Sequence, residues 1–239
     1  MATLFISDLH LDDRRPETTE LLLKFLHDEA VAADALYILG DLFEYWLGDD
    51  VTTQCANEVA LALMSLVNSG VPSFFIHGNR DFLLREDYAN RAGMTILPQE
   101  YVADLYGEKV LLMHGDSLCT DDVPYQQFRS MVRDPAWQDD FLGKAPHERL
   151  QVAKQARDAS AAHKGQVGME IMDVNQDEVV AAFERHGVYR MIHGHTHRPA
   201  THNLEINGQA VQRIVLGDWY TQGSVLRVEP GNYELSTLD

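Results

Sequence analysis

Metal-binding types of side chain are concentrated in five short motifs of this 239-residue chain. Asp, Asn and His together supply hard oxygen and imidazole donors, a combination that suits Mn, Fe, Zn or Mg. Glycines stand beside these donors and allow the backbone to turn sharply near a ligand. Each motif alone is typical of an ordinary loop, but the set indicates a metal centre. The motifs are Asp8-Leu9-His10, Gly40-Asp41, Gly78-Asn79-Arg80-Asp81, Met113-His114-Gly115-Asp116 and Gly194-His195-Thr196-His197.

Each motif follows a short apolar run that predicts a buried strand. Open α/β sheets gather their ligands at the carboxyl ends of such strands, so we expect the five motifs to meet. We also expect the two side chains of each D-x-H or H-x-H pair to share a side, because side chains alternate along a strand. The runs are Leu4–Ser7, Ala35–Leu39, Pro72–Ile76, Val110–Met113 and Gly187–Ile192.

The remaining pattern predicts an α/β sandwich of two sheets. Helices are expected over Glu17–Ala33, Ala56–Asn68 and Gln176–His186, from the spacing of their apolar residues. Asn207-Gly208 is a strong hairpin signal, and β-hairpins dominate the C-terminal part. We interpret residues 1–239 as a single domain with two packed sheets.

The segment from about residue 123 to residue 170 breaks this alternation of strands and helices. It has no strand signal and is rich in helix formers. Between Lys144 and Lys164 its Lys and Arg residues exceed its acidic residues by three, in a chain whose formal net charge is −18. A solvated helical hairpin would explain this pattern, and so would a helical cap insertion over an anionic active site.

Composition excludes several classes of protein. A net charge of −18 repels phosphates, so we expect no nucleic-acid partner. The longest apolar stretches are about half the ~20 residues of a membrane span. The N-terminus has no basic region of the kind that opens a signal peptide, and two cysteines are too few for a disulfide framework. We therefore expect a cytoplasmic protein, and no obligate protein partner is indicated.

Taken in order, the five motifs resemble the calcineurin-like metallophosphoesterases, whose pattern is D-x-H, G-D, G-N-[HR]-[DE], H-G and G-H-x-H. The resemblance runs from Asp8 to His197. It implies a two-sheet α/β fold and two metal ions, with Mn²⁺ as the expected metal and Asp41 as the bridging ligand. The implied ligands of the first ion are Asp8, His10, Asp41 and His197, and those of the second are Asp41, Asn79, His114 and His195.

Arg80 stands where many members of the superfamily carry a histidine that acts as a general acid. Arginine cannot release a proton at neutral pH, but it binds phosphate in a fixed fork. This suits a leaving group that is already a stable phosphate, as in a pyrophosphate bond. Together with Asp41, Asn79 and His195, Arg80 forms the expected catalytic set.

Longer runs around the motifs, such as Trp46-Leu47-Gly48-Asp49-Asp50, resemble the branch of the family that acts on UDP-2,3-diacylglucosamine in lipid A biosynthesis. The resemblance implies water attack, activated by metal, on the α-phosphorus, giving UMP and 2,3-diacylglucosamine 1-phosphate (lipid X). It also implies a peripheral protein on the cytoplasmic face of the inner membrane. The expected substrate-binding residues are Asn79, Arg80, Asp122, Tyr125, Arg157, Ser160, Lys164, Val167 and His195, although the Val167 side chain cannot make a polar contact.

Two alternatives remain open at this level. A related metallophosphoesterase could act on a soluble nucleotide-sugar or a dinucleotide, which needs no place for acyl chains. A non-catalytic scaffold of the same fold would be expected to have lost metal ligands, whereas all seven positions are intact here.

Overall fold

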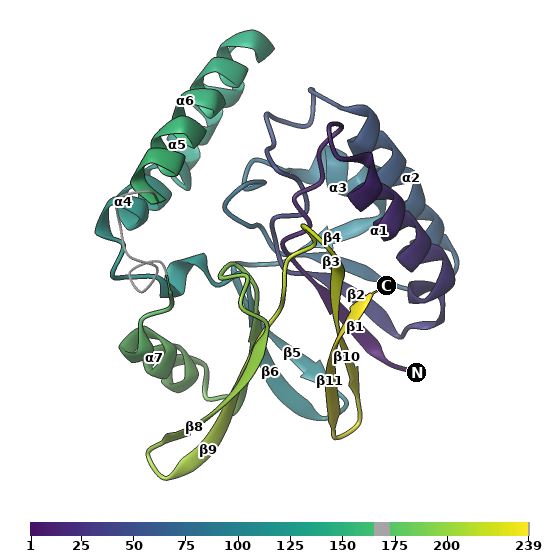
Figure 1. Ribbon diagram of the computed structural model, residues 1–239, viewed down its shortest axis with the longest axis vertical. Coiled ribbons are helices and arrows are strands. Elements are labelled where there is room, and N and C mark those ends of the chain that lie inside the picture. The colour runs from purple at the N-terminus through teal and green to yellow at the C-terminus, as the bar shows by residue number, and fades with distance from the viewer. Residues whose placement is uncertain (165–172, 239) are drawn as a thin grey trace.

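Two β-sheets form the centre of the protein, whose computed structural model describes residues 1–164 and 173–238, with the backbone alone described from 158 to 164 (Figure 1). The first sheet has six strands in the order β11-β10-β1-β2-β3-β4. β1 to β4 run parallel, and β10 joins β1 in the antiparallel sense. Its strands are β1 Thr3–Ile6, β2 Ala35–Ile38, β3 Ser73–Phe75, β4 Met94–Ile96, β10 Gly223–Glu229 and β11 Asn232–Leu238.

The second sheet has five strands in the order β5-β6-β7-β9-β8. β6, β7 and β9 are parallel, while β5 and β8 close the two edges as antiparallel hairpin partners. Phe5, Leu39, Leu112, Ile192 and Ile214 belong to the apolar cluster that joins the two sheets. The strands are β5 Glu100–Leu105, β6 Glu108–Met113, β7 Arg190–His193, β8 Ala200–Ile206 and β9 Gln209–Val215.

Helices cover the outer faces of both sheets and complete a layered sandwich (Figure 1). Three helices pack on the first sheet through a cluster that includes Leu22, Leu63 and Tyr88, and one helix packs on the second sheet through Val179 and Phe183. The predicted two-sheet α/β fold is therefore confirmed. The helices are α1 Pro16–Asp28, α2 Gln54–Asn68 and α3 Glu86–Ala92 on the first sheet, and α7 Gln176–His186 on the second; a 3₁₀ turn, Ala30–Ala32, follows α1.

Some boundaries differ from the sequence-based expectation. The first helix stops at Asp28 and continues as a 3₁₀ turn, although it was predicted to reach Ala33. Sequence reasoning also missed β4, a three-residue strand that directly follows the left-handed Gly93. So short a segment carries no periodicity of its own, and its pairing with β3 makes it a strand.

Three further helices form an arm that projects from the sandwich (Figure 1). They are α4 Val123–Val132, α5 Pro135–Leu142 and α6 Pro146–Lys164, and they follow a 3₁₀ turn at Asp116–Leu118. We call residues 123–164 the cap. Pro124, Pro135 and Pro146 stand at or near the helix starts, where proline costs no internal hydrogen bond.

A buried arginine and an aromatic contact help to fasten the cap to the sandwich. Arg149 is only 2% exposed, and its guanidinium donates to the Leu47 carbonyl oxygen at 2.6 Å and to both carboxylate oxygens of Asp50. Trp137 packs near Phe82, with ring centroids 6.3 Å apart. Phe141 belongs to the core cluster, and Trp137 and Leu142 pack against it, so these three side chains help to hold the cap in place.

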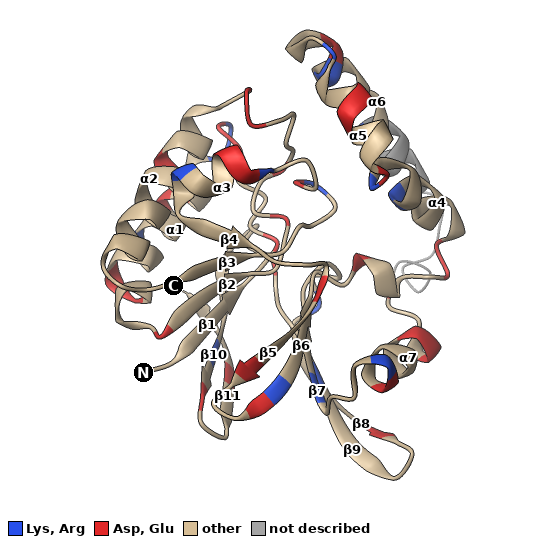
Figure 2. Ribbon diagram, turned by 180° about the vertical axis from the view of Figure 1, so that it is seen from behind, with Lys and Arg blue, Asp and Glu red and all other residues tan. Residues whose placement is uncertain are grey.

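The positive charge expected on the cap is also partly neutralised. Lys144 pairs with Asp140, which lies just outside the residues 144–164 over which the net charge was counted. Arg149 pairs with Asp50 from a distant loop. Figure 2 shows acidic and basic residues along the same cap helices. No helix within residues 1–164 and 173–238 is both long and apolar enough to cross a bilayer.

Candidate metal centre

Five of the seven predicted metal ligands have left-handed backbones. The φ angles of Asp8, His10, Asp41, His195 and His197 lie between +51° and +69°. Non-glycine residues rarely adopt this conformation, and it is concentrated at functional sites. Within the described chain only two other non-glycine residues share it: Tyr106, which leads into the turn between β5 and β6, and Asn207, in the turn between β8 and β9.

This backbone corrects one expectation. β1 ends at Ile6 and β7 at His193, so neither the D-x-H nor the H-x-H pair lies in an extended strand. Strand alternation therefore does not orient these side chains. Both residues of each pair instead have a left-handed backbone, and the two pairs supply donor atoms to the two groups described below.

Asp8, His10 and His197 form a first group of donor atoms. Nε2 of His10 lies 3.3 Å from Nε2 of His197. The His197 Nε2 atom lies 3.2 Å from Oδ1 of Asp8. Two donors bound to one ion at ~2.1 Å would be separated by ~3.0–3.4 Å. Asp8 Oδ1 is buried and has no hydrogen-bond partner in the described chain, although its fellow oxygen accepts from Ser7 and from the His195 amide. The group thus has the spacing of a cation site, and Asp8 Oδ1 is a ligand oxygen without a hydrogen bond in the described chain.

Asn79, His114 and His195 form the second group. Asn79 Oδ1 lies 3.0 Å from His114 Nε2 and 2.9 Å from His195 Nδ1. The Nδ1–H of His114 donates to the Leu39 carbonyl oxygen, so Nε2 is the atom left for a metal. Burial opposes protonation of His114, but Asp41 and Asp8 outweigh it and raise its pKa. The surrounding carboxylates therefore favour positive charge at this point.

Asp41 lies between the two groups. Its Oδ1 is 3.8 Å from His114 Nε2, and its Oδ2 is 3.8 Å from His10 Nε2. The Arg80 amide donates to Oδ1 at 2.8 Å and fixes the carboxylate in this orientation. One oxygen thus faces each group, as a bridging ligand requires.

Two glycines make room for these carboxylates. A Cβ atom at Gly78 would lie 2.1 Å from Asp41 Oδ1, and one at Gly194 would lie 2.2 Å from Asp8 Oδ2. Any other residue at these positions would displace the two carboxylates. This explains why glycine precedes Asn79 and His195 in their motifs.

Two carboxylates that sequence reasoning did not assign stand behind the histidines. Glu44 Oε2 lies 3.2 Å from His10 Nδ1, and Asp218 Oδ2 lies 3.4 Å from His197 Nδ1. Such partners fix the ring orientation of metal-binding histidines and raise their basicity. A signal was present, because Gly217-Asp218 repeats the Gly-Asp pattern of Gly40-Asp41 just beyond the end of a strand.

The residues predicted to contact substrate lie in three places: beside the metal groups, at the start of the cap or along it, and outside the described residues. Arg80 has a buried Nε without a hydrogen-bond partner in the described chain, beside the metal groups. Tyr125 also lies at the centre: its ring is 6.0 Å from that of His195, and its hydroxyl donates to Asp116 Oδ2 at 2.9 Å. Asp122 caps α4 by accepting from the Tyr125 amide, and Arg157 lies over the Tyr45 ring at 4.8 Å. The side chains of Ser160 and Lys164, and all of Val167, lie outside the described residues.

The described donors fit a pair of divalent ions, because the Asp41 carboxylate lies between two groups of donor atoms and each group combines oxygen and imidazole atoms. Comparison with protein families identifies the family to which such a site belongs. The model of the calcineurin-like phosphoesterases matches residues 1–199.

The chain belongs to this family.

The chain is also similar over its full length to known proteins. A protein of Stenotrophomonas maltophilia (strain K279a) is 58% identical, with 100% of this chain and 99% of the relative covered, and is named UDP-2,3-diacylglucosamine hydrolase. Proteins of the same name from Xanthomonas axonopodis pv. citri and Salmonella typhi are each 54% identical, over 98% or more of both chains. A solved structure described as a novel archaeal phosphodiesterase has a TM-score of 0.51 at 14% identity over both full chains, which supports the fold. This phosphoesterase is therefore a metal-dependent hydrolase.

Proposed function

We propose that this phosphoesterase hydrolyses the pyrophosphate bond of UDP-2,3-diacylglucosamine and releases UMP and 2,3-diacylglucosamine 1-phosphate. The observation that carries the proposal is full-length identity of 54–58% to proteins named for this substrate. The arrangement of six further donor residues around Asp41 supports it independently, since it suits hydrolysis of a phosphoric anhydride. A peripheral location on the cytoplasmic face of the inner membrane, where lipid A precursors are made, is part of the proposal.

The proposed ions are two Mn²⁺, held by the two groups of ligands. When bound, such a pair lowers the pKa of a water molecule and offsets negative charge on the phosphate oxygens. Asp41 would hold the two sites in fixed relation, and Asn79 and His195 would each serve as a ligand that also touches the substrate phosphate. Glu44 and Asp218 would keep the rings of His10 and His197 turned toward the centre.

Arg80 is proposed to bind the phosphate that is split. Its Nε is already free of hydrogen bonds within the described chain, so substrate binding would satisfy a buried donor. A guanidinium cannot protonate the leaving group, and a sugar phosphate does not require it. This favours a pyrophosphate bond over an alkyl phosphomonoester.

The glucosamine side of the substrate is proposed to lie under the cap. Tyr125 and Asp122 stand at its base beside the metal centre, while Arg157, Ser160, Lys164 and Val167 would line its upper part. Phe128, Met131, Leu150 and Val152 are exposed apolar residues on α4 and α6, available for acyl chains or a membrane surface. Burial of one such side chain stabilises a complex by ~1.5–3 kcal/mol.

A direct assay tests the proposal. The metal-free protein is reconstituted with Mn²⁺ and offered UDP-2,3-diacylglucosamine beside UDP-N-acetylglucosamine, and the products are identified by mass spectrometry. Cleavage of only the diacylated compound to UMP and its sugar phosphate is expected. Equal cleavage of both would instead favour a phosphoesterase for soluble nucleotide-sugars, and cleavage of neither would contradict the proposal.

A further inference from the structure

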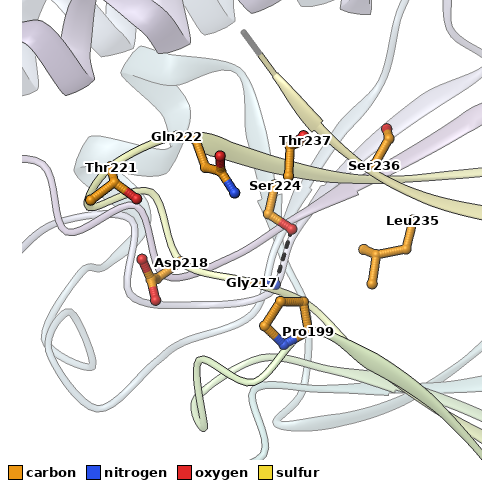
Figure 3. Close-up of a pocket in the computed structure, with 9 residues that line it drawn as sticks. All are labelled: Pro199, Gly217, Asp218, Thr221, Gln222, Ser224, Leu235, Ser236 and Thr237. Atoms are coloured by element: carbon orange, nitrogen blue, oxygen red, sulfur yellow. Dashed lines mark hydrogen bonds between the residues drawn. The ribbon is translucent and has the colours of Figure 1, made fainter.

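A cavity of about 550 Å³ lies outside the ligand set, and Figure 3 shows the residues that line it. It is bounded by Pro199 after the H-x-H motif, by the loop of residues 217–222, and by the β10–β11 hairpin. Its volume is within the range of small-ligand sites. One of its walls is Asp218, the carboxylate that contacts the metal-site residue His197.

The cavity and the cap lie at different ends of the ligand set. The cap reaches the second group: Tyr125 lies against His195, and Arg133 donates to the Gly78 carbonyl oxygen at 2.8 Å, next to Asn79. The 217–222 loop reaches the first group. The Trp219 amide donates to the Asp8 carbonyl oxygen at 3.1 Å, and the Tyr220 ring stacks on His10 with centroids 5.1 Å apart.

A pyrophosphate substrate has two different halves on either side of the bond that breaks. If the lipid-bearing glucosamine phosphate extends from the metal pair toward the cap, the nucleoside must leave the centre in another direction. The 217–222 loop borders the centre at the Asp8–His10–His197 end, and four residues of the same loop line the cavity. The geometry therefore places a compartment where the nucleoside would go.

The lining suits a neutral ligand with many hydrogen-bonding groups. Among the described residues that line the cavity none is Lys or Arg, and Asp218 contributes a negative charge, so a second phosphate would be disfavoured. The Gln222 amide, which points into the space between Asp218 and Ser224 in Figure 3, offers a donor and an acceptor. Ser224 Oγ accepts from the Gly217 amide and keeps its own proton to donate. Pro199 and Leu235 supply apolar contacts.

From this placement and this lining we propose that the cavity binds the uridine part of the substrate. The inference rests on the proposed function and adds a site for its nucleotide half. A uracil ring presents carbonyl oxygens and one N–H, which a carboxamide such as that of Gln222 can match. The ribose hydroxyls would meet Asp218, Ser224 and Thr237.

The test compares UMP with inorganic phosphate as ligands of the Mn²⁺-loaded protein, by calorimetry. Phosphate reports on the metal centre alone, so any additional affinity of UMP comes from the nucleoside. The variants are Gln222→Ala and Thr237→Val, both at exposed positions, and Gln209→Ala, at an exposed position on β9, is the matched control outside the cavity. We expect each cavity variant to weaken UMP by roughly two- to tenfold, the effect of one hydrogen bond, with phosphate unchanged.

The outcomes separate this inference from the proposed function. If UMP binds no better than phosphate, or if both cavity variants bind UMP like the control, the cavity is not the uridine site. If UMP binding responds as expected while UDP-2,3-diacylglucosamine is not cleaved, the uridine site stands and the proposed substrate is wrong. Equal losses for UMP and phosphate would show damage to the metal centre and would also overturn the assignment.

Discussion

Glu44 Oε2 lies 3.2 Å from Nδ1 of His10, while Nε2 of the same ring is turned toward His197 and Asp41. The ring is therefore held from behind by a carboxylate and presents its other nitrogen to the metal centre. Burial opposes protonation of His10, but Glu44, Asp41 and Asp8 together raise its pKa. Asp218 has the corresponding position behind His197.

The first prediction concerns these two carboxylates. Glu44→Gln and Asp218→Asn keep the shape of the side chains but remove their charge. Each should weaken metal affinity by ~10–100-fold, because the histidine loses the partner that orients its ring. Competition with a chelating dye measures this affinity. Glu205→Gln, at an exposed position on β8, is the control and should bind metal normally.

The second prediction is that Asp41→Ala abolishes turnover. Removal of the proposed bridge should lower kcat by at least ~10²–10³, the usual cost of losing a main electrostatic element of a site. Elemental analysis should show fewer than two metal ions per chain, with the circular dichroism spectrum unchanged. Near-normal turnover would rule out the binuclear assignment.

The third prediction concerns Arg80. Arg80→Ala should lower kcat/KM by roughly 10- to 150-fold, which corresponds to the loss of a charged hydrogen bond of about 1.5–3 kcal/mol. Arg80→Lys should recover only part of this, because an ammonium group cannot reproduce the fork. Metal content should stay constant in both variants. A fall in metal content would instead identify Arg80 as a structural support of the site.

The fourth prediction is that water attacks the α-phosphorus. Hydrolysis in ¹⁸O-labelled water should place the label in UMP, as mass spectrometry of the two products can establish. Label in the sugar phosphate would show that UMP is the leaving group and would contradict the proposed attack on the α-phosphorus.

The fifth prediction concerns the cap. Arg157→Ala and Lys164→Ala should each raise KM for the diacylated substrate by roughly tenfold, if each side chain loses one charged contact. Hydrolysis of a small chromogenic phosphodiester should change little. Lys154→Ala, an exposed cation on the same helix, is the control. Equal losses on both substrates would point to damaged folding, and no loss on either would mean that these residues form an ordinary solvated face.

Sequence reasoning predicted the two-sheet fold because most strands are apolar runs whose type does not depend on distant partners. The seven metal-ligand candidates could be named for a similar reason, since Asp, Asn and His beside glycine are visible in the chain itself. Their geometry could not be predicted. Left-handed backbone at Asp8 or His197 depends on the loops that pack around them, and the relation of Glu44 to His10 depends on two chain segments meeting.

The cap shows the same limit. Helices were expected there, and helices are found, but the sequence alone did not separate apolar residues that face a ligand from those that fasten the cap. Trp137 and Phe141 are used for attachment because Phe82 and the surrounding core meet them. Arg149 was counted as part of a positive surface, yet it is buried against Leu47 and Asp50. Each of these contacts joins residues more than 50 positions apart.

The left-handed backbones at five ligand positions have a consequence for the evolution of stability in this enzyme. Glycine at any of these positions would relieve a conformation that costs other residues of order 1–3 kcal/mol. It would also remove a side chain that is proposed to bind metal. Selection for heat resistance alone would therefore favour substitutions that disable catalysis, and only selection for activity keeps these side chains in place. The active site is thus where this protein is less stable than its fold permits.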